Sequence, residues 1–169
     1  MTDPELIERT RSLFLRDDNT YGCAEVALVA LSECWSLPEW ADSSAAMALN
    51  GGVAYSGGTC GAITGAAMAV GRLAEQRTTD HRQAKTIART IIQGLMKEFA
   101  DGYGSTDCRH LTGYDMTTDH EAFITSNIWR DVCMRQLEFA VDRLAPLGDP
   151  SVWEAEVARI NALQPGAEE

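Results

Sequence analysis

The sequence predicts an all-α protein, a single-domain helical bundle of about six to eight helices. Apolar residues recur three and four positions apart along most of the 169 residues, the spacing of one helix face. No segment of useful length alternates apolar and polar side chains as a strand does. A chain of this length can bury its own hydrophobic core, so we expect one domain over residues 1–169.

Helix-capping and helix-breaking residues define the elements in order. Asp3 suits the start of the first helix, Thr59 the N-cap of the fourth and Asp80 the N-cap of the fifth, which is expected to end at the glycines of residues 101–104. Residues 105–118 have no helical pattern. The expected helices span about residues 3–16, 21–35, 39–49, 59–76, 80–100, 127–144 and 150–163, with a short turn at 119–125.

Charge and composition narrow the class of partner and compartment. The net charge is −11, from 14 Lys and Arg against 25 Asp and Glu without a basic stripe, so we expect no nucleic-acid partner. Residues 43–71 carry no charge, but glycines and polar side chains interrupt them, which favours two buried helices joined by a glycine loop over a membrane span. A charged N-terminal segment and five widely spaced cysteines predict a reducing, cytoplasmic location.

Cys60 is the strongest candidate for chemistry. It lies between the glycine turn Gly57-Gly58 and a helix of small residues that opens with Gly61. The first turn of a helix carries unpaired N–H groups and partial positive charge, which favour a thiolate over a thiol. Neighbouring glycines let another backbone or an inorganic cofactor come close. The sequence therefore predicts sulfur chemistry at this position.

The other cysteines stand in different settings, and no two of the five form a C-x-x-C pair. Cys23 lies in the first turn of its expected helix and shares the electrostatic setting of Cys60. Cys108 lies in an irregular, polar stretch, where an inert buried thiol is not expected. Cys133 falls on an apolar stripe in mid-helix that is typical of a core, and Cys34 on an apolar face where we expect a structural thiol.

Two further features have more than one interpretation. Gly61 and Gly65 share a face of the fourth expected helix, where each glycine costs on the order of 1 kcal/mol relative to alanine. Close approach of another helix is the more frequent reason for such glycines, and approach of a cofactor is the alternative. His110 is a candidate metal ligand, although a single loop histidine more often forms ordinary hydrogen bonds; His81 and His120 are given no functional role.

The spacing of the cysteines leaves three kinds of site open. Four cysteines on separate segments are compatible with an iron–sulfur cluster, whose irons are held by thiolates. They are equally compatible with a zinc site of four cysteines, or of three cysteines and a histidine. A reactive dithiol pair with two bystanders is the third case.

Particular strings resemble a known family. They are Gly22-Cys23-Ala24, Gly51-Gly52, the run C-G-A-I-T-G-A-A-M-A-V-G at residues 60–71, C-R-H-L-T-G at 108–113, and Cys133. The set resembles the redox-active proteins named for their C_GCAxxG_C_C pattern, over about residues 15–145. One detail differs, because Cys60 precedes its glycine whereas the family name puts glycine first.

The resemblance implies an all-helical domain with four shared cysteines, and Cys34 lies outside the pattern. The shared cysteines are Cys23, Cys60, Cys108 and Cys133. A similar domain in split-Soret cytochromes accompanies an iron–sulfur cluster and haem in a dimer. This sequence has no C-x-x-C-H, so no covalent c-type haem is expected.

Three hypotheses follow. The first is an iron–sulfur cluster, 2Fe-2S or 4Fe-4S, that is bound by the four shared cysteines near Gly58, Gly61 and Gly65. Such a protein would act in electron transfer or in a linked small redox reaction. If one iron has a position without cysteine, His110 or Asp107 is the candidate ligand. The second is cofactor-free thiol–disulfide chemistry, with Cys60 as a low-pKa nucleophile and Cys23 or Cys108 as its resolving partner. The third is a zinc-binding or purely helical interaction module. The small-residue faces favour a homodimer, and the redox partner is unknown.

Overall fold

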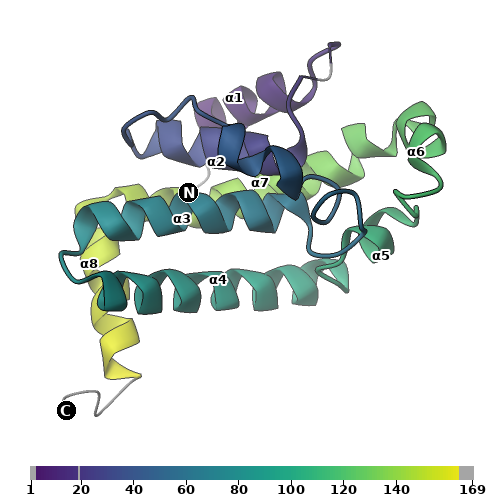
Figure 1. The fold of residues 1–169 in the computed structure, drawn as a ribbon. Helices are drawn as coiled ribbons and strands as arrows, with labels where there is room; N and C mark the ends of the chain where they lie inside the picture. Colours follow the sequence, from purple (N-terminus) through teal and green to yellow (C-terminus); the bar gives the residue numbers. More distant parts are fainter. Residues whose placement is uncertain (1–2, 19, 164–169) are drawn as a thin grey trace.

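The computed structural model describes residues 3–18 and 20–163, and these form helices in agreement with the predicted all-α class (Figure 1). The α-helices are α1 (Pro4–Phe14), α2 (Cys23–Cys34), α3 (Gly61–Arg77), α4 (His81–Tyr103), α5 (Cys108–Thr112), α6 (His120–Ser126), α7 (Val132–Leu144) and α8 (Pro150–Ala162). Short 3₁₀ helices are η1 (Ser44–Leu49), η2 (Ile128–Arg130) and η3 (Ala145–Gly148). Within the described residues, the sole extended pairing is an isolated antiparallel bridge between Thr59 and Asp107.

Helix α2 is the centre of the core. Every residue from Ala24 to Ser32 is buried, because α1, α3 and α7 pack around this helix. A helix that is apolar on all sides is stable only when it is covered in this way. Helix α3 in turn lies between α2 and α4, and the two long helices α3 and α4 run side by side (Figure 1).

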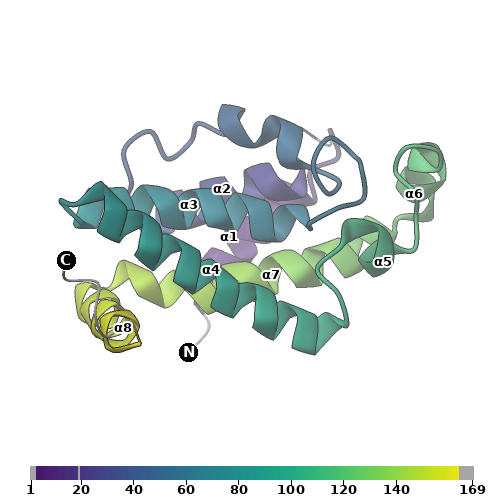
Figure 2. The same cartoon turned by 60° about the horizontal axis from the view of Figure 1, so that its bottom comes forward.

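The direction of the helices brings several helix starts to one end of the bundle. Figure 1 shows α2, α3 and α7 beginning at the end where α5 and α6 lie, whereas α8 crosses the opposite end. Figure 2 shows the same division, with α6 and α8 at the two extremes of the molecule. These helix starts therefore lie at the same end of the molecule, although they are far apart in the sequence (Figure 1).

Several predicted helix boundaries are confirmed and others need correction. Asp3 and Asp80 are N-caps whose carboxylates accept backbone N–H groups, and Gly104 ends α4 in the left-handed conformation. Thr59 is not the N-cap of α3; Cys60 is. The expected helix at 39–49 is a series of turns followed by η1, since the residues around Pro38 adopt positive φ angles.

The chain between α4 and α7 is more structured than expected. The stretch 105–118 contains the short helix α5, and the turn expected at 119–125 is the helix α6. The expected helix at 127–144 is broken, because Asn127 adopts a left-handed conformation with φ 57° and η2 follows it. Helix α7 therefore begins at Val132, five residues later than its apolar stripe indicates.

Residues 51–55 form a run of left-handed backbone, which we call the left-handed turn. Its φ angles are 61°, 75°, 65°, 51° and 59°, and the last three belong to Val53, Ala54 and Tyr55. Left-handed backbone costs roughly 1–2 kcal/mol for each residue that has a Cβ. Hydrogen bonds to the preceding η1 hold it, among them Ala54 N–H to the Ala48 carbonyl at 2.7 Å. Such strain is most often found at functional sites.

Within the part of the chain that the structure describes, no helix combines the length and the apolar character needed to cross a membrane.

Candidate functional site

The four cysteines that carry the family resemblance all lie at helix starts. Cys23 is the first residue of α2, Cys60 is the N-cap of α3, Cys108 is the first residue of α5 and Cys133 is the second residue of α7. Cys108 is thus in a helix rather than an irregular stretch, and Cys133 is at a helix start rather than in mid-helix. Because these helices begin at the same end of the bundle, the fold gathers the four residues there (Figure 1).

The segments before α3 and α5 are clipped together by backbone hydrogen bonds. The Cys60 N–H donates to the Thr106 carbonyl at 2.8 Å, and the Cys108 N–H donates to the Gly58 carbonyl at 2.7 Å. A third bond, 3.0 Å long, runs from the Arg109 N–H to the Gly57 carbonyl. We call this set of hydrogen bonds the clip. It holds the segments that carry Cys60 and Cys108 side by side through backbone contacts alone.

A cavity of about 210 Å³ lies at this end of the bundle, and Cys23, Cys108 and Cys133 line it. Most of the remaining wall is aromatic or apolar, including Phe14, Tyr21, Tyr55, Met116, Phe123, Ile124 and Trp129. Cys60 does not line the cavity. Its Sγ lies 3.6 Å from Oε1 of the buried Gln136, to which the thiol donates.

Backbone N–H groups surround the Cys23 sulfur. Those of Gly51, Ala24 and Gly61 are close enough to favour its thiolate form. Gly61 also lacks a side chain for a spatial reason, since a Cβ there would overlap the Cys23 Sγ. Gly65, one turn later, would overlap the Ala24 carbonyl if it had a Cβ. Gly65 therefore serves close packing of α3 on α2, whereas Gly61 makes room for the sulfur itself.

Burial dominates the acidity of these thiols. It raises the pKa of Cys23, Cys60 and Cys133, and it raises the pKa of Cys108 from 9.0 to about 12. Neighbouring thiolates add to the effect; ionised Cys23 raises the pKa of each of the other three.

The expected low pKa of Cys60 is therefore wrong for the metal-free chain. The N–H groups of Ala62 and Ile63 at the start of α3 do lower it, but loss of water around the sulfur has the larger effect.

A buried polar network supports the Cys23 end of the cavity. The carboxylate of Glu25 accepts hydrogen bonds from the Gly22 N–H at 2.9 Å, from Asn50 Nδ2 at 2.9 Å and from the Ser43 hydroxyl at 3.1 Å. The Asn50 Oδ1 in turn accepts from the Ala24 N–H at 2.9 Å. Sequence reasoning did not find this network. Its available signal was Gly22 followed three residues later by Glu25, the spacing of a capping box.

The opening of the cavity carries residues that sequence analysis left without a role. His120, exposed at the start of α6, packs edge-on against the half-exposed Tyr55, with ring centroids 5.0 Å apart. Deeper in the wall, the indole Nε1 of Trp129 is buried and has no hydrogen-bond partner, which sets it apart among the described side chains. No sequence motif marks either residue. The contact of His120 depends on the left-handed turn, which holds Tyr55, and the position of Trp129 depends on the break before α7.

Three candidates lie away from the cavity. His110 and Asp107 are exposed and, with Gly58, border an open hollow next to the clip. Cys34, expected to be a buried structural thiol, is exposed, because it is the last residue of α2 and the chain turns away after it. The structure thus separates Cys34 from the other four cysteines, as the family resemblance implies.

No ready-made site for one metal ion is present among the described residues, meaning no suitable group of three or more histidine, cysteine, aspartate or glutamate side chains. Three of the four helix-start cysteines line one cavity, and Cys60 is not part of its wall.

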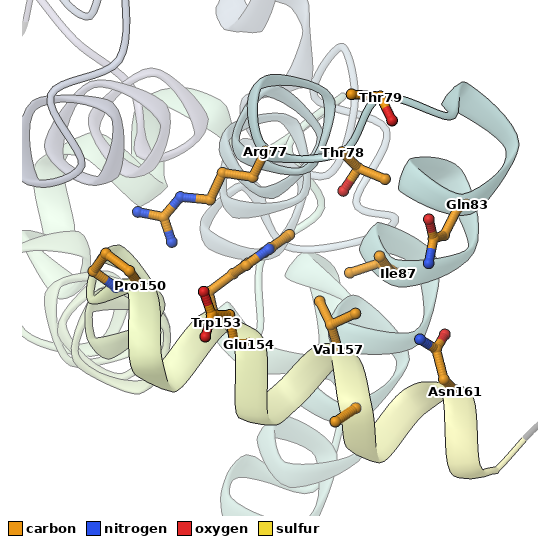
Figure 3. A pocket seen from close by; sticks show the side chains of 11 residues that line it. Arg77, Thr78, Thr79, Gln83, Ile87, Pro150, Trp153, Glu154, Val157 and Asn161 are labelled. Atoms are coloured by element: carbon orange, nitrogen blue, oxygen red, sulfur yellow. The ribbon is translucent and has the colours of Figure 1, made fainter.

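A larger hollow lies at the opposite end and has a different character (Figure 3). It measures about 620 Å³ and is formed by α8 and the corner between α3 and α4. The guanidinium of Arg77 lies beside Trp153 (Figure 3). It already has hydrogen-bond partners within the protein, because it donates to the carbonyls of Leu147 at 2.8 Å and Gly148 at 2.5 Å. This hollow contains no cysteine and no histidine.

Comparison with known proteins agrees with the site. The family model described as "Putative redox-active protein (C_GCAxxG_C_C)" matches residues 21–146, a span that contains all four helix-start cysteines. No curated protein and no solved structure gives a significant match. Because the family model covers well over half of the chain, this protein belongs to the C_GCAxxG_C_C family of redox-active proteins.

Proposed function

We propose that this protein binds an iron–sulfur cluster through Cys23, Cys60, Cys108 and Cys133 and acts in electron transfer. The observation that carries the proposal is the placement of these residues at four helix starts around one end of the bundle, three of them lining one cavity. A bound cluster would supply one-electron redox chemistry at a potential set by its surroundings.

The protein's own groups are suited to negative charge on sulfur. Backbone N–H groups of Gly51, Ala24 and Gly61 approach the Cys23 sulfur, and those of Ala62 and Ile63 approach Cys60. Apolar and aromatic side chains form much of the wall around these groups, and a less polar surrounding strengthens such interactions. Hydrogen bonds and burial of this kind are the features by which proteins tune such groups.

The raised thiol pKa values favour a bound cation over free thiol chemistry. A buried thiol with a pKa near 12, as at Cys108, is almost entirely protonated at neutral pH and is a poor nucleophile. Bound iron would require these thiols to be deprotonated and would supply the compensating positive charge. Two buried and two half-buried thiols that would repel one another as thiolates are therefore better suited to bind a cation than to act as free nucleophiles.

A single zinc ion is less well supported. Tetrahedral zinc holds each thiolate at about 2.3 Å, which requires the sulfurs to lie within about 4 Å of one another. Among the described residues, no group of three or more histidine, cysteine, aspartate or glutamate side chains is arranged to hold one metal ion. A cluster contains its own bridging sulfides, so its protein ligands are farther apart.

The second candidate is reversible disulfide chemistry between Cys60 and Cys108. The backbone clip between their two segments favours it, since it holds both residues on paired chain. The same burial that raises the pKa of both thiols counts against it.

The test is purification of the full chain without oxygen, followed by visible absorption and by analysis of iron, zinc and acid-labile sulfide. We expect a brown protein with matched iron and sulfide. A colourless protein without metal would contradict the proposal, and a protein with zinc but no sulfide would replace the cluster with a structural metal.

A further inference from the structure

We propose that Asn50 is a positioning residue for the Cys23 sulfur and that the buried carboxylate of Glu25 holds it in place. The inference rests on the proposed function, in which Cys23 binds the cluster. Asn50 is buried and ends η1, directly before the left-handed turn. Its amide fills the space beside Gly22, where a Cβ would overlap it.

The oxygen of the Asn50 amide controls the start of α2. Its Oδ1 accepts the Ala24 N–H at 2.9 Å and lies 4.0 Å from the Cys23 Sγ. The first N–H groups of a helix have no partner within the helix, so another group must accept them. Asn50 is the acceptor for Ala24, and it thereby fixes an N–H group that also lies close to the sulfur.

The nitrogen of the same amide fixes its orientation. Nδ2 donates to Glu25 Oε2 at 2.9 Å and to the Met47 carbonyl at 3.1 Å, so the oxygen must face the helix start. Glu25 accepts two further hydrogen bonds, from Gly22 and Ser43. A buried carboxylate with three donors is a rigid support, because each lost bond would leave a charged acceptor unsatisfied.

Asn50 also links the sulfur to the left-handed turn. Its carbonyl accepts the Tyr55 N–H at 3.2 Å, and the next N–H along the chain, that of Gly51, approaches the Cys23 sulfur. Two of the N–H groups beside Cys23 therefore depend on where Asn50 sits. Displacing the amide changes the hydrogen bonding of the sulfur without touching any cysteine.

The first test uses metal-free protein and amide hydrogen exchange. Asn50→Ala removes the acceptor of Ala24, and we expect that amide to exchange at least tenfold faster, while Leu28 and Leu31 in the middle of α2 keep their wild-type rates. Asn50→Asp combined with Glu25→Gln keeps an acceptor oxygen and an amide donor that can orient it, so Ala24 should stay protected. Asn161→Ala, on the exposed side of α8, is the matched control. Should Asn50→Ala fail to fold, Asn50→Ser, whose hydroxyl is shorter than the amide, replaces it.

The second test uses the cluster-loaded protein and its midpoint potential. Asn50→Asp places a second carboxylate against Glu25 and beside Cys23, and we expect a more negative potential and an altered visible circular dichroism spectrum. Combining it with Glu25→Gln provides a new amide donor between the two residues and should reverse part of the shift. Asn161→Asp should leave the potential unchanged.

The outcomes separate this inference from the proposed function. Wild-type protection of Ala24 in Asn50→Ala, or equal acceleration of every α2 amide, would overturn the positioning role. An unchanged potential in Asn50→Asp would overturn its effect on the sulfur. If wild-type protein carries no cluster, the proposed function fails, and the exchange pattern alone then decides whether Asn50 positions this helix start.

Discussion

The two ends of α3 differ in the chemistry of the groups around them. Its start, at Cys60 and Gly61, lies among buried thiols and backbone N–H groups. Its end, at Arg77, uses a charged side chain to hold two carbonyls of η3 and to lie over the Trp153 ring, 5.6 Å from its centre (Figure 3). The larger hollow is at the charged end and the smaller cavity at the sulfur end.

The chemistry of the lining residues therefore indicates the candidate site better than the volume of the hollow does. At the Arg77 end, the charged donor is already satisfied by carbonyls, so nothing there requires a ligand. At the Cys60 end, the thiols are held in a state that is unfavourable for thiolates unless a cation joins them. Variants at each end should therefore separate a loss of cofactor from a loss of stability.

The largest effect is expected from the cysteines themselves. Replacing Cys60 or Cys133 with serine should lower bound iron and sulfide at least tenfold and remove the visible absorption, because each would supply one thiolate ligand to the proposed cluster. Iron and sulfide analysis after anaerobic purification measures this. Cys34→Ser, an exposed cysteine, is the control and should keep wild-type values. A Cys133→Ser protein with full iron content would remove Cys133 from the ligand set.

Close packing of α3 on α2 should be the next most sensitive feature. Gly65→Ala puts a Cβ onto the Ala24 carbonyl, a backbone atom that cannot move alone, so we expect a loss of more than about 4 kcal/mol in the free energy of unfolding. Urea unfolding measures it. Gly71→Ala, in the same helix with open space around it, should instead be neutral or stabilise by up to about 1 kcal/mol. Equal effects of the two would show that packing at Gly65 is not tight.

The buried thiols should make the metal-free protein sensitive to alkali. A thiol with a raised folded-state pKa stabilises the fold fully below its unfolded value and loses that contribution as pH rises through the folded value. For Cys108 the window runs from pH 9.0 to about 12, and the loss is of the order of a few kcal/mol. Urea unfolding across this range should show falling stability, with a shallower fall in Cys108→Ala. Identical slopes in the two proteins would contradict the raised pKa.

The smallest effect is expected at the far end of α3. Arg77→Met removes two hydrogen bonds to carbonyls and the contact with Trp153, and it should cost about 2–3 kcal/mol of unfolding free energy. Iron content and absorption should stay at wild-type values. Arg89→Met, at an exposed arginine of α4, is the control and should change neither. Loss of absorption in Arg77→Met would show that the two ends are coupled.

The sequence was sufficient for the fold class and for part of the site. The caps at Asp3 and Asp80 and the glycine at 104 are local signals that tertiary packing does not override. The small-residue helix after the glycine turn was equally readable, and it placed Cys60 at a helix start.

The break before α7 and the left-handed turn could not be predicted, because the same sequence pattern is compatible with more than one backbone conformation. The stripe of Trp129, Cys133 and Leu137 keeps its spacing through η2 and α7, so periodicity cannot show that the helix breaks at Asn127 and restarts just before Cys133. The left-handed turn was unreadable beyond its two glycines, because residues with a Cβ rarely adopt that backbone. The network of Glu25 and Asn50 depends on that turn.

The most direct test of one shared site is thiol labelling of anaerobically purified protein, quantified cysteine by cysteine with and without an iron chelator. We predict that the exposed Cys34 is labelled in both conditions. Cys23, Cys60, Cys108 and Cys133 should stay unlabelled until iron is removed and should then be labelled together as the absorption fades, slowly at neutral pH and faster as the pH rises, because burial raises their pKa values. Labelling of Cys60 alone in the untreated protein, with no change in absorption, would contradict the account.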